Sequence, residues 1–303
     1  MSLPPAYLDY DKRGYGQDIE RYDWRLAKDR APVRLKNARQ VAAMIVIPCE
    51  YHPIDPQKNP FGHPHGMVTP FPDLRHFTTR DYGNRVGVFR LLDALKSAGL
   101  KATFPVSAAL LTRARPLAEA IVGDGHELAA AGLHGDAIHH AGLSESEERA
   151  MIEDVREAFD AAGFHPTTWL SPARQESFAT PDLLAEAGFT AVLDWESDGV
   201  PLPLRTRGRP ITALPLLNEL DDFRLLVERK QTEDLWTDQI LEAKDYLKAE
   251  HDRHGAQVLG FTLTPFVAGQ PFRMRSLTNM LAEFAGDEAV WCAGASEIRG
   301  AFP

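Results

Sequence analysis

Short apolar runs that alternate with helical patterns limit most strongly how this chain can fold. The run VAAMIVI at 41–47 has the length of a strand and no polar face, which is typical of a strand covered on both sides. Comparable runs lie at 102–106, 126–132, 167–170, 190–194, 258–264 and 289–293. Helical patterns separate most of them. At least six strand–helix repeats predict a parallel sheet, and this many units favour a closed or nearly closed α/β barrel.

The alternative architecture is an open, doubly wound sheet. Its nucleotide-binding form has no support, because neither a GxGxxG nor a GxxxxGK[ST] motif follows any apolar run. Two helix ends can be placed from local signals. Gly99 follows an apolar stripe over 88–95 and is expected to end that helix in a left-handed conformation. Ser144 and Glu147 form an S-x-x-E capping box that predicts a helix reaching about Ala162.

Other segments have weaker signals. The stretch 49–81 is rich in proline and lacks a helical period, so we predict a long loop that acts as a lid or binding loop. The segments 213–217 and 223–228 are predicted to be extended. Thr180-Pro181 predicts a cap and an N1 proline for a helix over 181–187. Residues 1–40 are expected to form an N-terminal arm packed on a single barrel domain over 41–303.

The composition argues against several classes of partner. The formal net charge is −10 and no basic stripe occurs. Binding to nucleic acid or to an anionic membrane is therefore disfavoured, and the expected partner is a small-molecule substrate.

The two cysteines, Cys49 and Cys292, form no CxxC pair, so neither a zinc knuckle nor a disulfide framework is expected. The N-terminal stretch has no apolar core of a signal peptide, and no apolar run could span a membrane, so the expected setting is cytoplasmic.

Polar residues directly after the predicted strands are the candidates for an active site, because barrel sites form at the carboxyl ends of strands. These residues are Glu50, His134, Arg174, Asp194, Trp195, Glu196, Glu219, Asp221, Asp222 and Thr264. Glu50 follows the apolar run almost directly, so it is expected at the barrel mouth with limited solvation and suits a general base. The neighbouring Cys49 could be a nucleophile, although strand alternation points it away from Glu50.

Two groups of histidines could bind a metal ion. His134 and His139 lie in the segment HGDAIHH, which in a loop would allow two imidazoles to share a metal. The alternative is a polar loop with incidental histidines. His63 and His65 form an H-x-H pair in the proline-rich segment, a spacing that suits a metal on a strand and carries less weight in a loop.

The order of motifs resembles that of the polysaccharide deacetylase family over roughly residues 40–300, and most of all its allantoinase-like branch. The similar features are YGxRVGxxRLxxxL from Tyr82 to Leu95, the SExEER helix start, Arg174, the D-x-R of Asp222 and Arg224, and the G-x-P-x-R of 269–273. The resemblance implies a distorted seven-stranded (β/α) barrel, homo-oligomers, and hydrolysis of C–N bonds other than peptide bonds. The family's substrates include N-acetyl sugars, allantoin and cyclic imides.

The sequence departs from the family pattern at positions where the family has a metal ligand and a general acid. The first motif of the family ends in two acidic residues, a base and a metal ligand, and here these positions read Glu50 and Tyr51. The late Leu-His motif, whose histidine acts as general acid, reads Leu263-Thr264. A threonine hydroxyl cannot by itself protonate a leaving nitrogen near neutral pH.

The second motif of the family contains a metal-binding histidine shortly after G-H-E. Direct counting leads to Ala131, whereas an insertion of a few residues would place His134 there with His139 as its partner. A tetrahedral site needs three protein ligands, and only these two histidines remain. The expectation is therefore no bound cofactor, with a divalent metal such as zinc as the alternative.

The first functional hypothesis is a metal-independent hydrolase of a small amide, ureide or cyclic imide. Glu50 would activate water, Arg174 and backbone amides would hold the oxyanion, and His134 or His139 would protonate the leaving nitrogen. The expected substrate-binding residues are Tyr51, Tyr82, Asp194 and Trp195.

Two further hypotheses remain. In the second, Glu50, His134 and His139 bind a metal in a rearranged deacetylase site, and Asp222 is the base. In the third, the chain is a non-catalytic, small-molecule binding member of the family, which the loss of a ligand and of the acid would explain.

Overall fold

The computed structural model describes residues 19–23, 25–56 and 72–303. Its strands are β1 (Val41–Val46), β2 (Thr103–Val106), β3 (Glu127–Ala130), β4 (Thr168–Trp169), β5 (Ala191–Val192), β6 (Leu202–Leu204), β7 (Ile211–Ala213), β8 (Gln257–Thr262) and β9 (Val290–Cys292). Its α-helices are α1 (Leu74–Tyr82), α2 (Val88–Ala98), α3 (Ala108–Arg113), α4 (Arg115–Gly123), α5 (Glu145–Ala161), α6 (Thr180–Glu186), α7 (Glu233–His254), α8 (Met274–Gly286) and α9 (Ala295–Ala301). Two wide-turn helical segments are η5 (Gly83–Gly87) and η8 (Phe223–Glu228).

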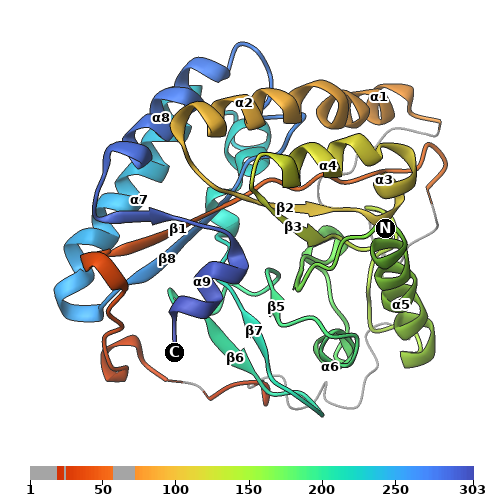
Figure 1. The fold of residues 1–303 in the computed structure, drawn as a ribbon, viewed down its shortest axis with the longest axis horizontal. Coiled ribbons are helices and arrows are strands. Elements are labelled where there is room, and N and C mark those ends of the chain that lie inside the picture. The colour runs from red at the N-terminus through yellow and green to blue at the C-terminus, as the bar shows by residue number, and fades with distance from the viewer. Residues whose placement is uncertain (1–18, 24, 57–71) are drawn as a thin grey trace.

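The strands form one curled sheet in the order β6-β7-β5-β4-β3-β2-β1-β8, and β9 pairs with β1 (Figure 1). All pairings are parallel except the β6–β7 hairpin. The chain after β7 returns to the other end of the sheet, where Leu217 N donates to Gly260 O of β8 at 3.0 Å. The predicted α/β barrel is thus confirmed. The sheet has more strands than the seven predicted, because the β6–β7 hairpin extends one edge and β9 pairs with the first half of β1.

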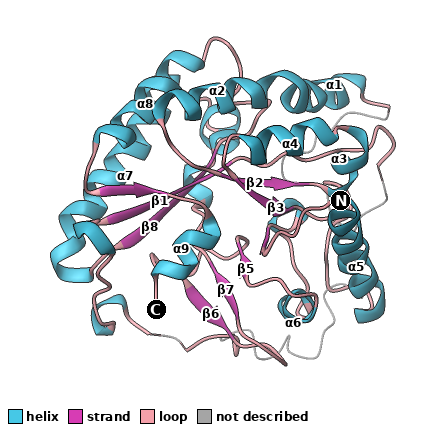
Figure 2. Ribbon diagram, in the orientation of Figure 1, coloured by secondary structure: helices cyan, strands magenta, loops and turns pink. Residues whose placement is uncertain are grey.

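The apolar run of β1 is buried on both sides, which explains why it shows no polar face. Ala43 and Ile45 belong to the cluster that packs against the outer helices, including Leu91 of α2. Met44 and Val46 belong to a second cluster inside the curled sheet, together with residues that follow β4, β5 and β7. Figure 2 shows most of the helices outside the strands, whereas α9 packs against β1 and β5 on the inner side of the curled sheet. This arrangement leaves the carboxyl ends of the strands as the open end of the barrel.

Local sequence signals placed several helix ends. The Ser144–Glu147 capping box is present at the start of α5, and Gly99 ends α2 with a φ of 67°. The predicted cap at Thr180 is wrong. Thr180 is the first helical residue of α6, and its hydroxyl donates to Glu148 instead of capping the helix. A buried acceptor from another helix therefore outweighs the local capping geometry.

Two predicted irregular or extended segments are helical. Within 49–81, Leu74–Tyr82 forms α1, capped by Asp73, whose carboxylate accepts from His76 N at 2.9 Å. The loop prediction is wrong there because α1 buries polar side chains and so has no apolar stripe. Residues 57–71, with His63 and His65, lie outside the described residues. The segment 223–228 was predicted to be extended and is the helical segment η8.

Part of the segment before β1 contacts the barrel. Arg21 forms an ion pair with Asp182 at 2.8 Å, and Arg30 pairs with Asp198. The Val33 carbonyl accepts from Ala256 N at 2.8 Å, just before β8.

Among the described residues, no helix is long and apolar enough to cross a membrane.

Candidate active site

Glu50 lies at the carboxyl end of β1, where the chain continues alongside the extension of β2. Cys49 N donates to Pro105 O at 2.7 Å, and Ser107 N donates to Cys49 O at 3.1 Å. These bonds fix the backbone on both sides of the Cys49 side chain, which faces the core and is fully buried. Burial raises the pKa of the Cys49 thiol, which does not suit a nucleophile. Glu50 faces the opposite way, toward the barrel mouth.

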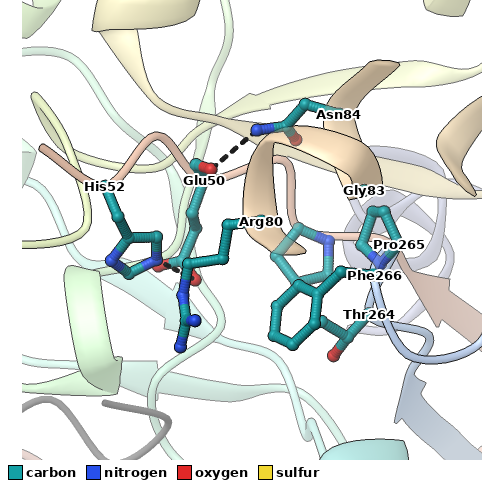
Figure 3. Close-up of a pocket in the computed structure, with 9 residues that line it drawn as sticks. Glu50, His52, Arg80, Gly83, Asn84, Thr264, Pro265 and Phe266 are labelled. Carbon is teal, nitrogen blue, oxygen red and sulfur yellow. Dashed lines mark hydrogen bonds and ion pairs between the residues drawn. The ribbon is translucent and has the colours of Figure 1, made fainter. Parts of the chain in front are cut away.

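A small pocket opens beside Glu50 (Figure 3). It encloses about 230 Å³ when its open mouth is included. Three segments contribute to its wall: the end of β1, the α1–η5 helix and the chain after β8. The lining residues are Pro48, Glu50, His52, Arg80, Gly83, Asn84, Thr264, Pro265 and Phe266.

Glycines allow the α1–η5 helix to lie directly on the chain after β8. A Cβ atom on Gly87 would come within 2.1 Å of Pro265 O, and one on Gly83 within 2.7 Å of Phe266 N. A larger residue at either position would push the helix away from the barrel mouth. The close approach is what brings Arg80 and Asn84 to the pocket.

The Glu50 carboxylate is held close to an imidazole. Its Oε2 lies 3.7 Å from His52 Nε2, and the two side chains are 18% and 8% exposed. Asn84 Nδ2 donates to the Glu50 carbonyl at 2.9 Å, which fixes the backbone at this point (Figure 3). The ring of His52 is in turn packed against Gly135, where a Cβ atom would meet His52 Cε1 at 2.4 Å.

Arg80 brings a buried positive charge to the pocket. Its side chain is 5% exposed, and its guanidinium group lies over the Phe266 ring at 4.9 Å from the centroid. Burial lowers the pKa of Arg80 to about 10, against the opposing effect of Glu50 and Asp73, so the group is charged at neutral pH. Sequence reasoning missed Arg80 because it fell in a predicted loop. The spacing His76, Arg80, Asn84 would have revealed a helical face.

The pocket wall formed by Thr264 is backed by Asp222. Asp222 is fully buried, and its Oδ2 accepts from Thr264 N at 2.8 Å. Neither Asp222 Oδ1 nor Thr264 Oγ1 has a hydrogen-bond partner among the described residues. Burial, reinforced by the charge of Asp221, raises the pKa of Asp222 well above its usual range.

The predicted residues Arg174, Asp194 and Trp195 form a separate cluster after β4 and β5. Arg174 Nη2 donates to Leu216 O at 2.6 Å, and the residue has a positive φ of 54°. Such a conformation costs of order 1–3 kcal/mol in a residue other than glycine. Trp195 Nε1 donates to Glu176 Oε2 at 2.9 Å. Of the described residues, the pocket lining includes none of these side chains.

Glu176 was not identified from the sequence, and it forms a carboxyl pair with Asp194. Burial and the charge of Asp194 raise the pKa of Glu176 well above its usual range. Burial also raises the pKa of Asp194, although Ser171 N donates to its carboxylate at 2.9 Å. The pair therefore retains a proton that two isolated carboxyl groups would lose.

The two candidate histidines do not meet at Glu50. His139 is buried, with its Nδ1 3.0 Å from Glu148 Oε1 and its ring edge-on to Trp169. His134 is half-buried, and burial lowers its pKa against the opposing effect of Asp136. Neither histidine is among the described residues that line the pocket.

The side chains that the structure describes do not fit a metal site of the family type. Within the described part of the chain, no group of three or more His, Cys, Asp or Glu residues is placed to hold a metal ion. Ala131, at the position reached by direct counting, is a buried methyl group. His139 is engaged with Glu148.

The two predicted tyrosines pack against arginines. Tyr51 lies under the Arg113 guanidinium group at 4.3 Å from the ring centroid. The Tyr82 hydroxyl accepts from Arg90 Nη1. Neither tyrosine belongs to the described pocket lining, so the geometry gives them no direct contact with a ligand in this pocket.

Comparisons with known proteins agree with the fold and the motifs. Residues 72–192 match the family model described as polysaccharide deacetylase. No curated protein sequence matches the chain. A Mycobacterium smegmatis protein assigned to the polysaccharide deacetylases is 25% identical, with a TM-score of 0.74 over 89% of this chain and 94% of that chain.

Two further solved structures share the fold at lower identity. A Pseudomonas aeruginosa PAO1 protein assigned to the same family has a TM-score of 0.76 at 22% identity, over 95% of this chain and 96% of that chain. PuuE allantoinase has a TM-score of 0.76 at 22% identity, over 96% of both chains. The family match shows a polysaccharide deacetylase domain over residues 72–192, and the solved structures share the barrel fold of the whole chain.

Proposed function

We propose that this protein hydrolyses a non-peptide C–N bond of a small amide, ureide or cyclic imide, with Glu50 as general base and without the family's usual metal. The observation that carries the proposal is the Glu50 carboxylate, held at the carboxyl end of β1 in a pocket that also presents a buried arginine. Support for a C–N hydrolase comes from the family match and from the likeness to PuuE allantoinase.

The geometry suggests how these residues would act. Glu50 takes a proton from a water molecule as the water oxygen attacks the carbonyl carbon. The His52 imidazole beside Glu50 orients the carboxylate. Arg80, which also lines the pocket, holds the negative charge that develops on the carbonyl oxygen, a role that the sequence analysis gave to Arg174. Arg174 instead donates to the Leu216 carbonyl.

The pocket favours a small, planar substrate. Even with its open mouth included, the pocket encloses only about 230 Å³. The Phe266 ring and the Arg80 guanidinium group lie 4.9 Å apart in the pocket wall, which offers a ligand an aromatic face beside a positive charge (Figure 3). A cyclic imide or a ureide is flat and polar on both edges, which matches this lining better than a bulky sugar polymer.

Glu50→Gln tests the proposal, because glutamine keeps the size of the side chain and removes its basicity. We expect turnover of the best substrate, found in a panel of ureides, cyclic imides and N-acetyl amino sugars, to fall by about 10²–10⁴. Ligand binding should persist. Glu153→Gln, at an exposed position of α5, is the matched control. Unchanged turnover in Glu50→Gln would refute the assignment, and loss of wild-type activity with a chelator would refute the metal-free part.

A non-catalytic binding role is the second candidate function. Its supporting observation is Thr264, which lines the pocket where the resemblance implies a histidine acid. The same panel distinguishes the two functions. Saturable binding without turnover, with and without divalent metal, would favour this candidate.

A further inference from the structure

Hydrolysis of a C–N bond needs a proton donor as well as a base, because the departing nitrogen is a poor leaving group without a proton. Among the described residues that line the pocket, the side chains that can exchange a proton are Glu50, His52, Arg80 and Thr264. Glu50 is the base. Burial lowers the pKa of Arg80 only to about 10, so it keeps its proton at neutral pH. Thr264 Oγ1 is a weak acid and is buried in the wall. His52 remains, and imidazole exchanges protons readily near neutral pH.

The backbone around Tyr51 turns the side chains of Glu50 and His52 to the same side (Figure 3). Tyr51 N donates to Ser107 Oγ at 3.2 Å, and Gly135 N donates to Tyr51 O at 2.8 Å. Residues two positions apart in an extended segment lie on one face. The described pocket lining accordingly includes Glu50 and His52 but not Tyr51. The order E-x-H therefore brings a carboxylate and an imidazole to one pocket.

Two contacts hold the His52 ring beside the Glu50 carboxylate. A Cβ atom on Gly135 would meet His52 Cε1 at 2.4 Å, so the ring has no room to move toward this loop. The ring of His76 lies edge-on to that of His52, with 5.9 Å between the centroids. His76 is itself fixed, because its Nδ1 accepts from Arg80 Nη1 at 3.0 Å. The His52 ring is thus packed in place and not loosely hung at the pocket mouth.

A base and an acid that lie side by side suit hydrolysis at a single carbon atom. The attacking oxygen and the leaving nitrogen are bonded to the same carbon, so the groups that serve them must be neighbours. Glu50 Oε2 and His52 Nε2 are 3.7 Å apart, and catalytic contacts of this kind often shorten when a substrate binds. The two side chains are 18% and 8% exposed, so both retain surface from which to reach a ligand.

We propose that His52 is the general acid of this site, which protonates the leaving nitrogen from Nε2 and is recharged by Glu50. This inference rests on the proposed function. Glu50 takes one proton from water, and the water oxygen forms the new C–O bond. When the C–N bond breaks, its electron pair moves to nitrogen, which takes the proton of His52. Glu50 then passes its own proton to His52 Nε2, so both side chains regain their starting states without a proton from solvent.

A change of leaving group separates acid catalysis from mere support of the Glu50 carboxylate. The two probes are an N-alkyl amide and a p-nitrophenyl ester that share the acyl group of the best substrate in the panel. The alkylamine must be protonated to leave, whereas p-nitrophenolate leaves without a proton. We expect His52→Gln to lower kcat on the amide by about 10²–10⁴ and on the ester far less. Equal losses on both probes would overturn the proposal, because a misplaced Glu50 would slow both.

Three further variants complete this comparison. Glu50→Gln should slow both probes, so its failure marks failure of the proposed function and not of this inference alone. His165→Gln, at a side chain that is 73% exposed, is the matched control and should change neither rate. His52→Asn is a second replacement in case His52→Gln does not fold, and melting curves identify the folded variants. An unchanged amide rate in either folded His52 variant would overturn the proposal.

Added imidazole gives a readout that a structural role would not move. In His52→Gly, a free imidazole molecule can enter the space of the lost ring and give its proton to the leaving nitrogen. We expect imidazole to restore hydrolysis of the amide, whereas pyrazole, which has the same shape but is a far weaker base, should not. Equal restoration by both molecules would show only that a void had been filled, and it would overturn the proposal.

Discussion

His139 Nδ1 and Glu148 Oε1 lie 3.0 Å apart, and each side chain is 1% exposed. Glu148 also accepts from the hydroxyl groups of Ser177 and Thr180, so one carboxylate joins α5, the start of α6 and the loop after β3. A histidine that the sequence suggests for catalysis is thereby part of the packing between these elements.

This pair predicts a loss of stability from His139→Ala. Removing one partner of a buried pair leaves the other charge without compensation, at a cost of about 3–5 kcal/mol. Urea denaturation measures the cost, and kcat of the remaining folded protein should be close to wild type. Glu153→Gln, on the exposed face of α5, is the control. A stable His139→Ala variant with no turnover would contradict the structural role.

The same carboxylate predicts a pH dependence of stability. Burial alone would raise the pKa of Glu148, but hydrogen bonds from His139, Ser177 and Thr180 outweigh it and hold the pKa below its usual range. The contribution of Glu148 is therefore present above the pKa of the unfolded chain and is lost as pH falls through the folded pKa. Urea midpoints of wild type and Glu148→Gln should converge in acid. A constant difference between them would contradict the prediction.

The carboxyl pair of Glu176 and Asp194 predicts the opposite dependence. Because the folded-state pKa of Glu176 is raised, the folded chain binds more protons than the unfolded chain, and stability falls as pH rises toward that pKa. Glu176→Gln can still accept from Trp195 Nε1 and has no proton to lose. We expect its urea midpoint to change less than that of wild type as pH rises from the pKa of an unfolded glutamate toward the folded-state pKa. Parallel curves would argue against a shared proton.

Gly87→Ala tests how the pocket wall is assembled. The new Cβ atom would lie 2.1 Å from Pro265 O, a backbone atom that cannot rotate away. We expect a loss of about 1–3 kcal/mol in the free energy of unfolding, together with a loss of turnover. Gly123→Ala is the control, because a Cβ atom there has nothing within 4 Å. That variant should be neutral or slightly more stable.

Gly135→Ala tests the contact behind Glu50. Its Cβ atom would come within 2.4 Å of His52 Cε1, so the imidazole must move away from the Glu50 carboxylate. We expect kcat to fall more than stability. In a His52→Ala background the clash is gone, and the stability cost of Gly135→Ala should shrink by about 0.5–3 kcal/mol. Equal costs in both backgrounds would show that the ring does not limit this site.

Much of the barrel could be predicted because its signals are local. The run 41–47 has no polar face, and both sides of β1 are buried by different clusters. The Ser144–Glu147 box and Gly99 act within one helical turn, so the sequence alone places them. Glu50 could be placed at the barrel mouth for the same reason, since it comes shortly after a buried strand.

The rest of the candidate site depends on contacts between distant segments. Arg80 reaches the pocket only because Gly83 and Gly87 let its helix lie on the chain after β8, and Asp222 is fixed by the amide of Thr264. The sequence by itself determined the barrel and the position of Glu50, because strand periodicity and helix caps are short-range properties. Only the tertiary structure decided which polar side chains surround Glu50, because burial and orphaned hydrogen-bonding atoms exist only after distant strands and helices have packed.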